Sequence, residues 1–174
     1  MSFSGPIRCF LWALAILMFC AVAPNTQAAP PSVDPALKAT FGDWSLRCES
    51  TALNAGEQCV LVQSIISEDR PTFQLAVIVL KNPAGSYVLR VVAPLGIILP
   101  SGLGLKIDRL DIGRTGFVRC LANGCMAEVT MDDGLIQRFS KGETALFVVF
   151  SSPDDGVGVP IRLFGFASGI LKVQ

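Results

Sequence analysis

Residues 117–129 read FVRCLANGCMAEV, and this stretch is the strongest indication of the fold. Segments with strand chemistry flank the loop Leu121-Ala122-Asn123-Gly124, in which the Asn-Gly pair tolerates a left-handed backbone. Cys120 and Cys125 lie on either side of this loop. Cysteines that face each other across antiparallel strands have the short separation that a disulfide needs. The stretch therefore predicts a β-hairpin with a disulfide at its tip.

A second cysteine-containing hairpin is expected upstream. Between residues 41 and 48, apolar side chains alternate with polar ones, which is the period-two pattern of a half-buried strand. Residues 59–66 have the chemistry of the returning strand. A disulfide between Cys48 and Cys59 would link the two strands of this hairpin next to the loop that connects them.

The amino terminus has the three-part layout of a secretory signal peptide. Arg8 precedes an unbroken apolar run from Cys9 to Ala23, and small and polar residues follow at positions 24–29. The run has about 15 residues, fewer than the roughly 20 that cross a bilayer as a helix. We therefore expect residues 1–28 to be a signal peptide, with no integral membrane span left after its removal.

Two positions compete for the cleavage site. Thr26 and Ala28 are the small residues of the preferred site, which would start the mature chain one residue later. Ala21 and Ala23 form a rival pair, but cleavage there would leave Pro24 directly after the cut, where its fixed φ suits a protease poorly. Cleavage after Ala28 is the prediction.

Export determines how the cysteines are interpreted. Cys9 and Cys20 leave with the signal peptide, so the mature chain keeps an even set of cysteines. In an oxidising compartment such a set implies disulfides. Three pairings are possible, and proximity in the sequence favours the two hairpin pairings, Cys48 with Cys59 and Cys120 with Cys125.

The rest of the chain alternates short strand patterns with turn residues. The proline-rich residues 29–40 indicate a flexible leader, so the folded domain is expected to span residues 41–174. Residues 75–80 are apolar on both faces, which predicts a central strand that is covered on each side. Between residues 132 and 141 the apolar side chains recur at helical spacing, with acidic residues first and a basic residue last, as a helix dipole prefers. One short helix is expected there. Strand patterns lie at 41–48, 59–66, 72–80, 87–92, 105–108, 117–120, 125–129, 143–151 and 157–166.

These patterns together define a fold class. Regularly spaced short strands with turn residues between them are typical of an all-β domain. We expect a single-domain antiparallel sandwich or a partly closed barrel that carries one short helix and two disulfides.

The landmarks of the chain also match a known family. In order they are Phe41-Gly42-Asp43-Trp44 with Cys48, Cys59 with Gln63, Pro94-Leu95-Gly96, Cys120 with Asn123-Gly124-Cys125, and Phe164-Gly165-Phe166. With these marks the chain resembles the invasion associated locus B proteins of Gram-negative bacteria, mainly alphaproteobacteria. The resemblance implies export to the periplasm or cell envelope, or secretion, together with a β-rich domain and a part in envelope or host interaction linked to virulence. It implies no catalytic residues.

The chemistry that the chain lacks limits its possible activities. The sequence contains no histidine, which excludes Ser-His-Asp and Cys-His nucleophile arrangements and histidine-ligated metals. Ser140 and Lys141 are adjacent, so they would not face each other as a Ser-Lys pair. Without Arg8 the chain is close to neutral and offers no field to attract nucleic acid. We expect no catalytic residues and no cofactor.

Two groups of residues allow both a chemical and a structural interpretation. Cys120 and Cys125 are separated by four residues, not by the two of thioredoxin-type motifs, so a structural disulfide is favoured over a redox pair. Zinc held by all four cysteines is disfavoured, because their spacings do not match the usual paired zinc motifs. The pairs Asp132-Asp133 and Asp154-Asp155 lack the alternation of a calcium loop and suit a helix start and a turn.

Aromatic residues and strand edges are the remaining candidates for a binding surface. Trp44, Phe147, Phe150, Phe164 and Phe166 lie in strand patterns, where aromatic side chains usually belong to the core. An uncovered strand edge pairs readily with an extended partner segment, but the sequence does not identify the edge.

The leading hypothesis is an exported, non-catalytic protein of the periplasm or envelope that binds an envelope or host protein. The alternative is a periplasmic enzyme of unusual chemistry, based on carboxylates or on a redox disulfide.

Overall fold

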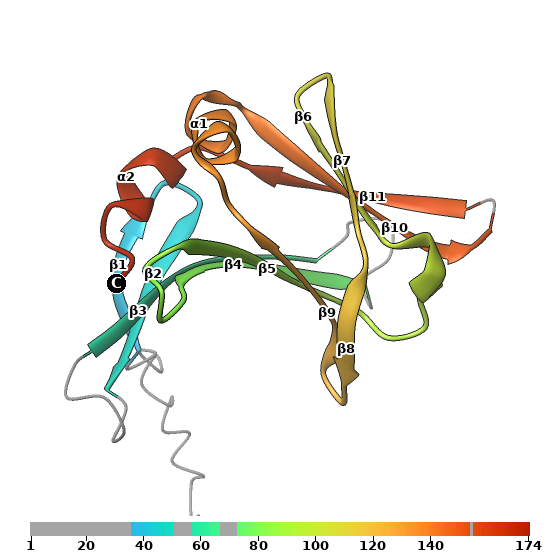
Figure 1. Ribbon diagram of the computed structural model, residues 1–174, viewed down its shortest axis with the longest axis horizontal. Helices are drawn as coiled ribbons and strands as arrows, with labels where there is room; N and C mark the ends of the chain where they lie inside the picture. Colours follow the sequence, from blue (N-terminus) through green and yellow to red (C-terminus); the bar gives the residue numbers. More distant parts are fainter. Residues whose placement is uncertain (1–35, 51–56, 67–72, 154) are drawn as a thin grey trace, which may run out of the picture. The chain divides into compact units, whose positions relative to one another are not determined.

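The computed structural model describes residues 36–50, 57–66, 73–153 and 155–174, and its strands form two antiparallel sheets (Figure 1). The first sheet has seven strands in the spatial order β1 (Leu37–Phe41), β2 (Trp44–Ser50), β3 (Glu57–Ile66), β4 (Gln74–Lys81), β5 (Tyr87–Ala93), β9 (Gly124–Thr130) and β8 (Phe117–Leu121). The second has four, in the order β11 (Asp155–Arg162), β10 (Thr144–Ser152), β6 (Leu103–Ile107) and β7 (Leu110–Thr115).

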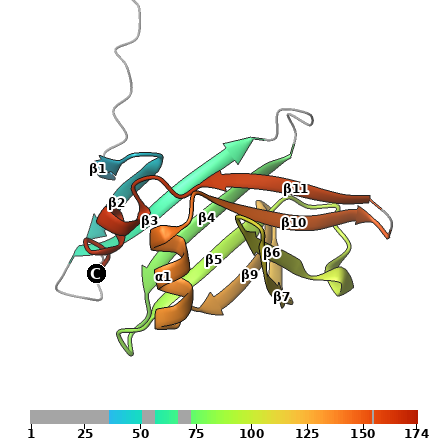
Figure 2. The same ribbon diagram turned by 90° about the horizontal axis from the view of Figure 1, so that it is seen from above.

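The two sheets pack face to face around one hydrophobic core. Figure 2 shows β10 and β11 crossing over β3, β4 and β5, with helix α1 (Asp133–Lys141) beside them. A short helix, α2 (Phe166–Ile170), and a 3-10 turn, η1 (Leu99–Ser101), complete the described elements. All described residues belong to one compact unit, and their sheets do not close into a barrel. The predicted antiparallel sandwich is confirmed.

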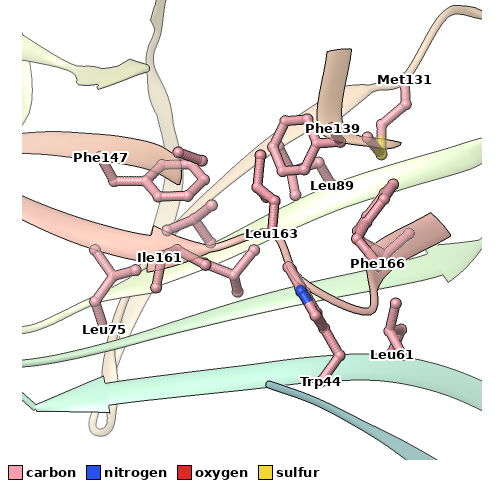
Figure 3. Packing of buried hydrophobic residues seen from close by; sticks show 14 of the residues in the cluster. Trp44, Leu61, Leu75, Leu89, Met131, Phe139, Phe147, Ile161, Leu163 and Phe166 are labelled. Atoms are coloured by element: carbon pink, nitrogen blue, oxygen red, sulfur yellow. The ribbon is translucent and has the colours of Figure 1, made fainter. Parts of the chain in front are cut away.

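The core is built from alternate residues of the strands. Leu75, Val77 and Val79 of β4 are fully buried and face β10 and β11, as the period of two requires. Larger side chains extend the core beneath the helices: the Phe166 ring of α2 packs against Trp44 of β2 and Phe139 of α1 (Figure 3). Each such side chain contributes about 1.5–3 kcal/mol of transfer free energy when it is fully buried.

Helix α1 has the bounds that its sequence predicts. The Asp132 side chain accepts a hydrogen bond from the Leu135 backbone N–H at 2.7 Å, which caps the amino end of the helix. Leu135 and Phe139, one turn apart, bury the inner face. Arg138 and Lys141 lie in the last turn, where positive charge is stabilised by the negative end of the helix dipole.

Three local predictions differ from the structure. Strand β1 begins at Leu37, so the last residues of the predicted leader pair with β2 instead of remaining free. The glycines at both ends of residues 113–116 predict a loop there. In the structure these residues overlap β7, whose strand pairing tolerates a bulge next to Gly113. The predicted final strand at 157–166 ends at Arg162, because Gly165 takes a φ of 92° and turns the chain into α2.

None of the helices among the described residues is long and apolar enough to cross a membrane. The predicted signal peptide at 1–28 lies outside the described residues, as does the loop at residues 51–56 of the first hairpin.

Candidate binding site

The four cysteines among the described residues form two bridges within hairpins. Cys48 and Cys59 are direct partners on β2 and β3, with their Cα atoms 4.0 Å apart and their sulfurs bonded. Cys120 and Cys125 are partners on β8 and β9, with Cα atoms 3.9 Å apart. This is the pairing that proximity in the sequence favours, and it gives each bridge a structural role in its hairpin.

One group of potential metal-binding side chains occurs among the described residues. Ligand atoms of Cys48, Glu57 and Cys59 lie within 4.8 Å of one another. Both sulfurs belong to a disulfide and are not thiolates, so they do not suit a metal ion. The Glu57 carboxylate pairs instead with the Lys38 ammonium at 2.7 Å.

The predicted acidic and hydroxyl candidates have structural partners. Asp132 caps helix α1, and the Asp155 carboxylate accepts a hydrogen bond from the Ser151 hydroxyl at 3.0 Å. The Ser140 hydroxyl donates to the Ile136 carbonyl at 2.8 Å, which does not suit a nucleophile paired with Lys141. Asp154 lies outside the described residues.

Four of the five aromatic candidates are fully or partly buried. Trp44, Phe147 and Phe166 have at most 1% of their surface exposed and belong to the core. Phe150 is half-buried beneath the Arg114 guanidinium, 5.0 Å from its ring centroid. Phe164 alone among them is exposed, at 70% of its surface.

The landmarks at the two ends of the domain meet in space. The Asp43 N–H donates to the Phe164 carbonyl at 3.1 Å, and the Trp44 and Phe166 rings pack edge to face with centroids 5.3 Å apart. Gly165 approaches the Phe41 carbonyl so closely that a Cβ built on it would lie 2.0 Å from the carbonyl oxygen. We call this contact between residues 41–44 and 164–166 the terminal joint. The motifs at 41–44 and 164–166 therefore have a structural role, because their glycines allow the close approach of the two backbones and their aromatic rings pack together.

Gln63 connects the terminal joint to the sheets. It is 4% exposed, and its amide NH₂ donates to the Asp43 carbonyl at 3.1 Å and to the Arg162 carbonyl at 3.0 Å. The Trp44 indole N–H donates to the same Arg162 carbonyl at 3.2 Å. Two carbonyl acceptors fix the orientation of the amide, because a flipped side chain would place oxygen against oxygen. Its Oε1 has no hydrogen-bond partner among the described residues.

The structure identifies the sheet edges that the sequence left open. Strands β1 and β8 border the seven-stranded sheet, and β11 and β7 border the four-stranded sheet. Strand β8 is exposed at four of its five residues, including Val118 at 63%. Strand β11 carries Pro160, which removes one hydrogen-bond donor from its backbone.

The strand register also defines an apolar surface on the side of the seven-stranded sheet that points away from the core. Its residues share one orientation, pointing away from β10 and β11: Val60, Val62, Ala76, Ile78, Leu80, Val88, Val92 and Met126. Val62 pairs with Ile78, and Ala76 pairs with Val92, which pairs in turn with Met126, so the side chains form a continuous surface. We call it the outer face.

No described element covers the outer face. Its members are half-buried and absent from the side chains that pack against the core cluster. In Figure 1 the described helices and the second sheet all lie on the opposite side of β4 and β5. The prediction that residues 75–80 would be covered on both sides is therefore wrong for one side within the described structure.

One ion pair is embedded in the outer face. The Arg90 Nε and Glu128 Oε1 atoms are 2.7 Å apart on paired positions of β5 and β9, and each side chain is 32% exposed. Their charges compensate each other, so the outer face has no uncompensated charge at its centre. The sequence contained a signal for this surface, because the run at residues 75–80 is apolar on both faces where a solvated sheet alternates.

Comparisons with known proteins agree on one family. The model of the "Invasion associated locus B (IalB) protein" family matches residues 44–174. Invasion protein B homologues from two strains of Brucella abortus, 2308 and 9-941, are each 30% identical over 149 residues, which cover 84% of both chains. The crystal structure of invasion associated protein b from Bartonella henselae superposes with a TM-score of 0.66 at 19% identity, covering 77% of this chain and 92% of that one.

Proposed function

The chain belongs to the invasion associated locus B family, and we propose that it is an exported, non-catalytic protein that binds a protein of the cell envelope through its outer face. The observation that carries this proposal is an apolar sheet surface that no described element covers. Monomeric proteins rarely leave large apolar patches exposed unless the patch binds a partner.

The proposed location is the periplasm or the cell envelope. The first 28 residues have the layout of a signal peptide, and the two disulfides suit an oxidising compartment. Relatives in Brucella abortus and Bartonella henselae carry names that refer to invasion. For this chain we propose an interaction with a protein of the cell envelope. A host protein is the second class of partner.

The make-up of the outer face favours a protein partner. Its aliphatic side chains would gain transfer free energy of about 25 cal/mol for each Å² removed from water. The Arg90–Glu128 pair is already neutralised within the face, so a partner would not need a matching charge. Apolar surface around a compensated ion pair resembles the core of a protein interface, which is depleted in unpaired charges.

The enzymatic alternative receives no support from the described side chains. The carboxylates of Asp132 and Asp155 serve a helix cap and a turn, and Cys120 and Cys125, the candidate redox pair, form a hairpin bridge. The chain has no histidine to act as a general base.

A cross-linking pull-down tests the proposal. Mature protein, residues 29–174, is cross-linked in intact producing cells, and partners are identified by mass spectrometry. The test variant is Ile78→Asp, which places a second carboxylate opposite Arg90, already paired with Glu128, and so leaves one net negative charge at the centre of the outer face. The matched control is Leu171→Asp, which places the same charge at a leucine that is 77% exposed elsewhere.

We expect wild type and Leu171→Asp to recover one envelope protein at stoichiometric yield, and Ile78→Asp to recover roughly tenfold less, as for a hot-spot residue. Unfolding curves of both variants establish that they are folded, and Val62→Thr provides a milder change at a neighbouring position. Equal recovery by the folded Ile78→Asp variant, or recovery of nothing by wild type, would refute the proposal. Recovery of a second copy of this chain would show that the outer face binds another copy and not an envelope protein.

A further inference from the structure

A cavity of about 120 Å³ lies between the two sheets, on the opposite side of the seven-stranded sheet from the outer face. Its walls come from β5 and β9 of one sheet, from β6, β7 and β10 of the other, and from helix α1. The inner walls include Leu103, Ala127 and Phe147, each at most 4% exposed. We call this space the inter-sheet cavity.

Small side chains leave the inter-sheet cavity unfilled. Ala127 of β9 has a single methyl group, whereas Val91, its partner on β5, has a branched side chain. On the facing sheet Gly113 has no side chain, and a Cβ built on it would meet no atom within 4 Å beyond its chain neighbours. Gly113 pairs with Leu105, which lines the cavity, so this Cβ would point to the same side as Leu105. The empty space at Gly113 therefore belongs to the cavity.

The inter-sheet cavity opens along β7, the border strand of the four-stranded sheet. Gly113 is exposed there, and Ile112 and Thr115 are half-buried, in contrast to the buried inner walls. Thr115 pairs with Leu103, which faces the interior, so the Thr115 side chain lies on the cavity side of β7. A threonine hydroxyl both donates and accepts hydrogen bonds. The mouth of the cavity therefore offers a neutral polar group.

The charged residue beside this mouth points away from the cavity. Arg114 pairs with Gly104, and a Cβ built on Gly104 would lie 3.4 Å from the Val148 Cβ and 3.9 Å from the Arg114 Cγ. The Arg114 guanidinium lies 5.0 Å from the Phe150 ring centroid. Val148 and Phe150 alternate along β10 with buried residues such as Phe147, so they occupy the other face of the four-stranded sheet. Among the described residues that line the cavity, none directs a charge into it.

We propose that the inter-sheet cavity binds a neutral, single-chain aliphatic molecule with a hydrogen-bonding oxygen at one end, such as a primary alcohol. The chain supplies apolar contacts that the cavity walls lack. The oxygen forms a hydrogen bond with the Thr115 hydroxyl at the mouth. A carboxylate or an ammonium group would lose hydration there without meeting an opposite charge, so the site discriminates against charged amphiphiles. This site is separate from the outer face and does not depend on the function proposed for that face.

The volume limits the length of the enclosed chain. An apolar cavity of about 150 Å³ accommodates benzene, so by proportion one of 120 Å³ holds about five carbon atoms. Each enclosed CH₂ group should tighten binding roughly fourfold, because its transfer from water is favourable. Carbons beyond that number stay in water and should add no affinity.

An NMR titration of the mature chain with primary alcohols from propan-1-ol to octan-1-ol tests the proposal. The methyl resonances of Leu103 and Ile112 report binding at the cavity itself, and pentanoate is the charged counterpart of pentan-1-ol. Ala127→Leu fills the cavity from its inner wall, and Thr115→Val replaces the hydroxyl by a methyl group of similar size. Arg114→Gln is the control, because it removes a charge from the other face of the sheet. Unfolding curves accompany each variant, and Thr115→Val remains informative if Ala127→Leu fails to fold.

We expect saturable shifts of these methyl resonances, with an affinity that rises roughly fourfold for each carbon up to pentan-1-ol and then levels off. Pentanoate should bind roughly tenfold more weakly than pentan-1-ol, or weaker still. Thr115→Val should weaken pentan-1-ol by roughly two- to tenfold, the loss of one hydrogen bond, whereas Arg114→Gln should leave its affinity unchanged. Folded Ala127→Leu should no longer bind any of the alcohols.

Several results would overturn the proposal. One is the absence of saturable shifts in the wild type. Another is an affinity that keeps rising at the same rate up to octan-1-ol, which would indicate adsorption on exposed apolar surface. Equal binding of pentanoate and pentan-1-ol, an unchanged affinity in Thr115→Val, or undiminished binding by folded Ala127→Leu would also refute it.

Discussion

Gly165→Ala should be among the most destabilising single substitutions in this protein. Gly165 has a φ of 92°, in a region that L side chains rarely adopt. A methyl group at this position would lie 2.0 Å from the Phe41 carbonyl oxygen and 2.7 Å from the Gly42 nitrogen. Both neighbours are backbone atoms, so the overlap is relieved only if the two segments of the terminal joint move apart.

The size of the effect follows from what that movement breaks. The left-handed backbone by itself costs a residue with a Cβ about 1–2 kcal/mol. Separation of the segments removes the Asp43 to Phe164 hydrogen bond, which contributes about 1 kcal/mol. It also loosens the edge-to-face pair of Trp44 and Phe166, which contributes about 1 kcal/mol beyond its burial. We expect a total loss of about 3–4 kcal/mol, a large part of the roughly 5–15 kcal/mol of a typical domain.

Equilibrium unfolding in urea, followed by tryptophan fluorescence, measures this loss. The chain has two tryptophans, and removal of the predicted signal peptide leaves Trp44, which lies within the terminal joint. The matched control is Gly85→Ala, because Gly85 has a φ of 83° but no atom within 4 Å of an added Cβ. The control should lose only the backbone cost of about 1–2 kcal/mol. Equal losses in the two variants would show that the close approach has no energetic consequence, and would refute the reasoning.

Three further predictions concern stability. Replacing Cys48 and Cys59 together by serine should reduce the free energy of unfolding by about 3 kcal/mol, the chain-entropy value for a sequence separation of 11, and a urea titration of the folded double variant measures it. Asp132→Ala removes the cap of α1 and should cost about 1 kcal/mol by thermal unfolding, whereas Asp133→Ala, without a capping bond in the structure, should cost less. Gln63→Met keeps the side-chain volume but removes the side-chain donor to the Asp43 carbonyl and leaves the Arg162 carbonyl with the Trp44 indole N–H alone. Urea unfolding should show a loss of about 1–3 kcal/mol, and a loss below about 0.5 kcal/mol would contradict the role of this amide.

The local elements were largely predictable because their signals are local. The Asn-Gly loop between Cys120 and Cys125 predicted its hairpin and bridge, and helix α1 has the capping aspartate and terminal charges of its sequence pattern. Strand β1 escaped prediction because prolines upstream indicated a leader, whereas pairing with β2 stabilises it. Helix α2 escaped because Phe164 and Phe166 have strand chemistry, and the turn at Gly165 depends on its contact with Phe41.

The candidate surfaces were less predictable. The run at residues 75–80 indicated burial on both faces, but only the arrangement of the second sheet determined which face stayed uncovered. The cavity of about 120 Å³ that Leu103, Ala127 and Phe147 line has no sequence signature, because its walls come from strands and a helix that are distant in the chain.

The sequence by itself determined the secondary structure of most elements, the disulfide pairing and the expectation of export, since turns, alternation and short loops act between near neighbours. The tertiary structure alone decided how the ends of the domain meet. The hydrogen bond from Asp43 to Phe164 and the contact of Gly165 with Phe41 join residues more than a hundred positions apart. Such contacts depend on the packing of the whole core, because the hydrophobic effect that assembles the core is non-directional and specifies no partner in the sequence.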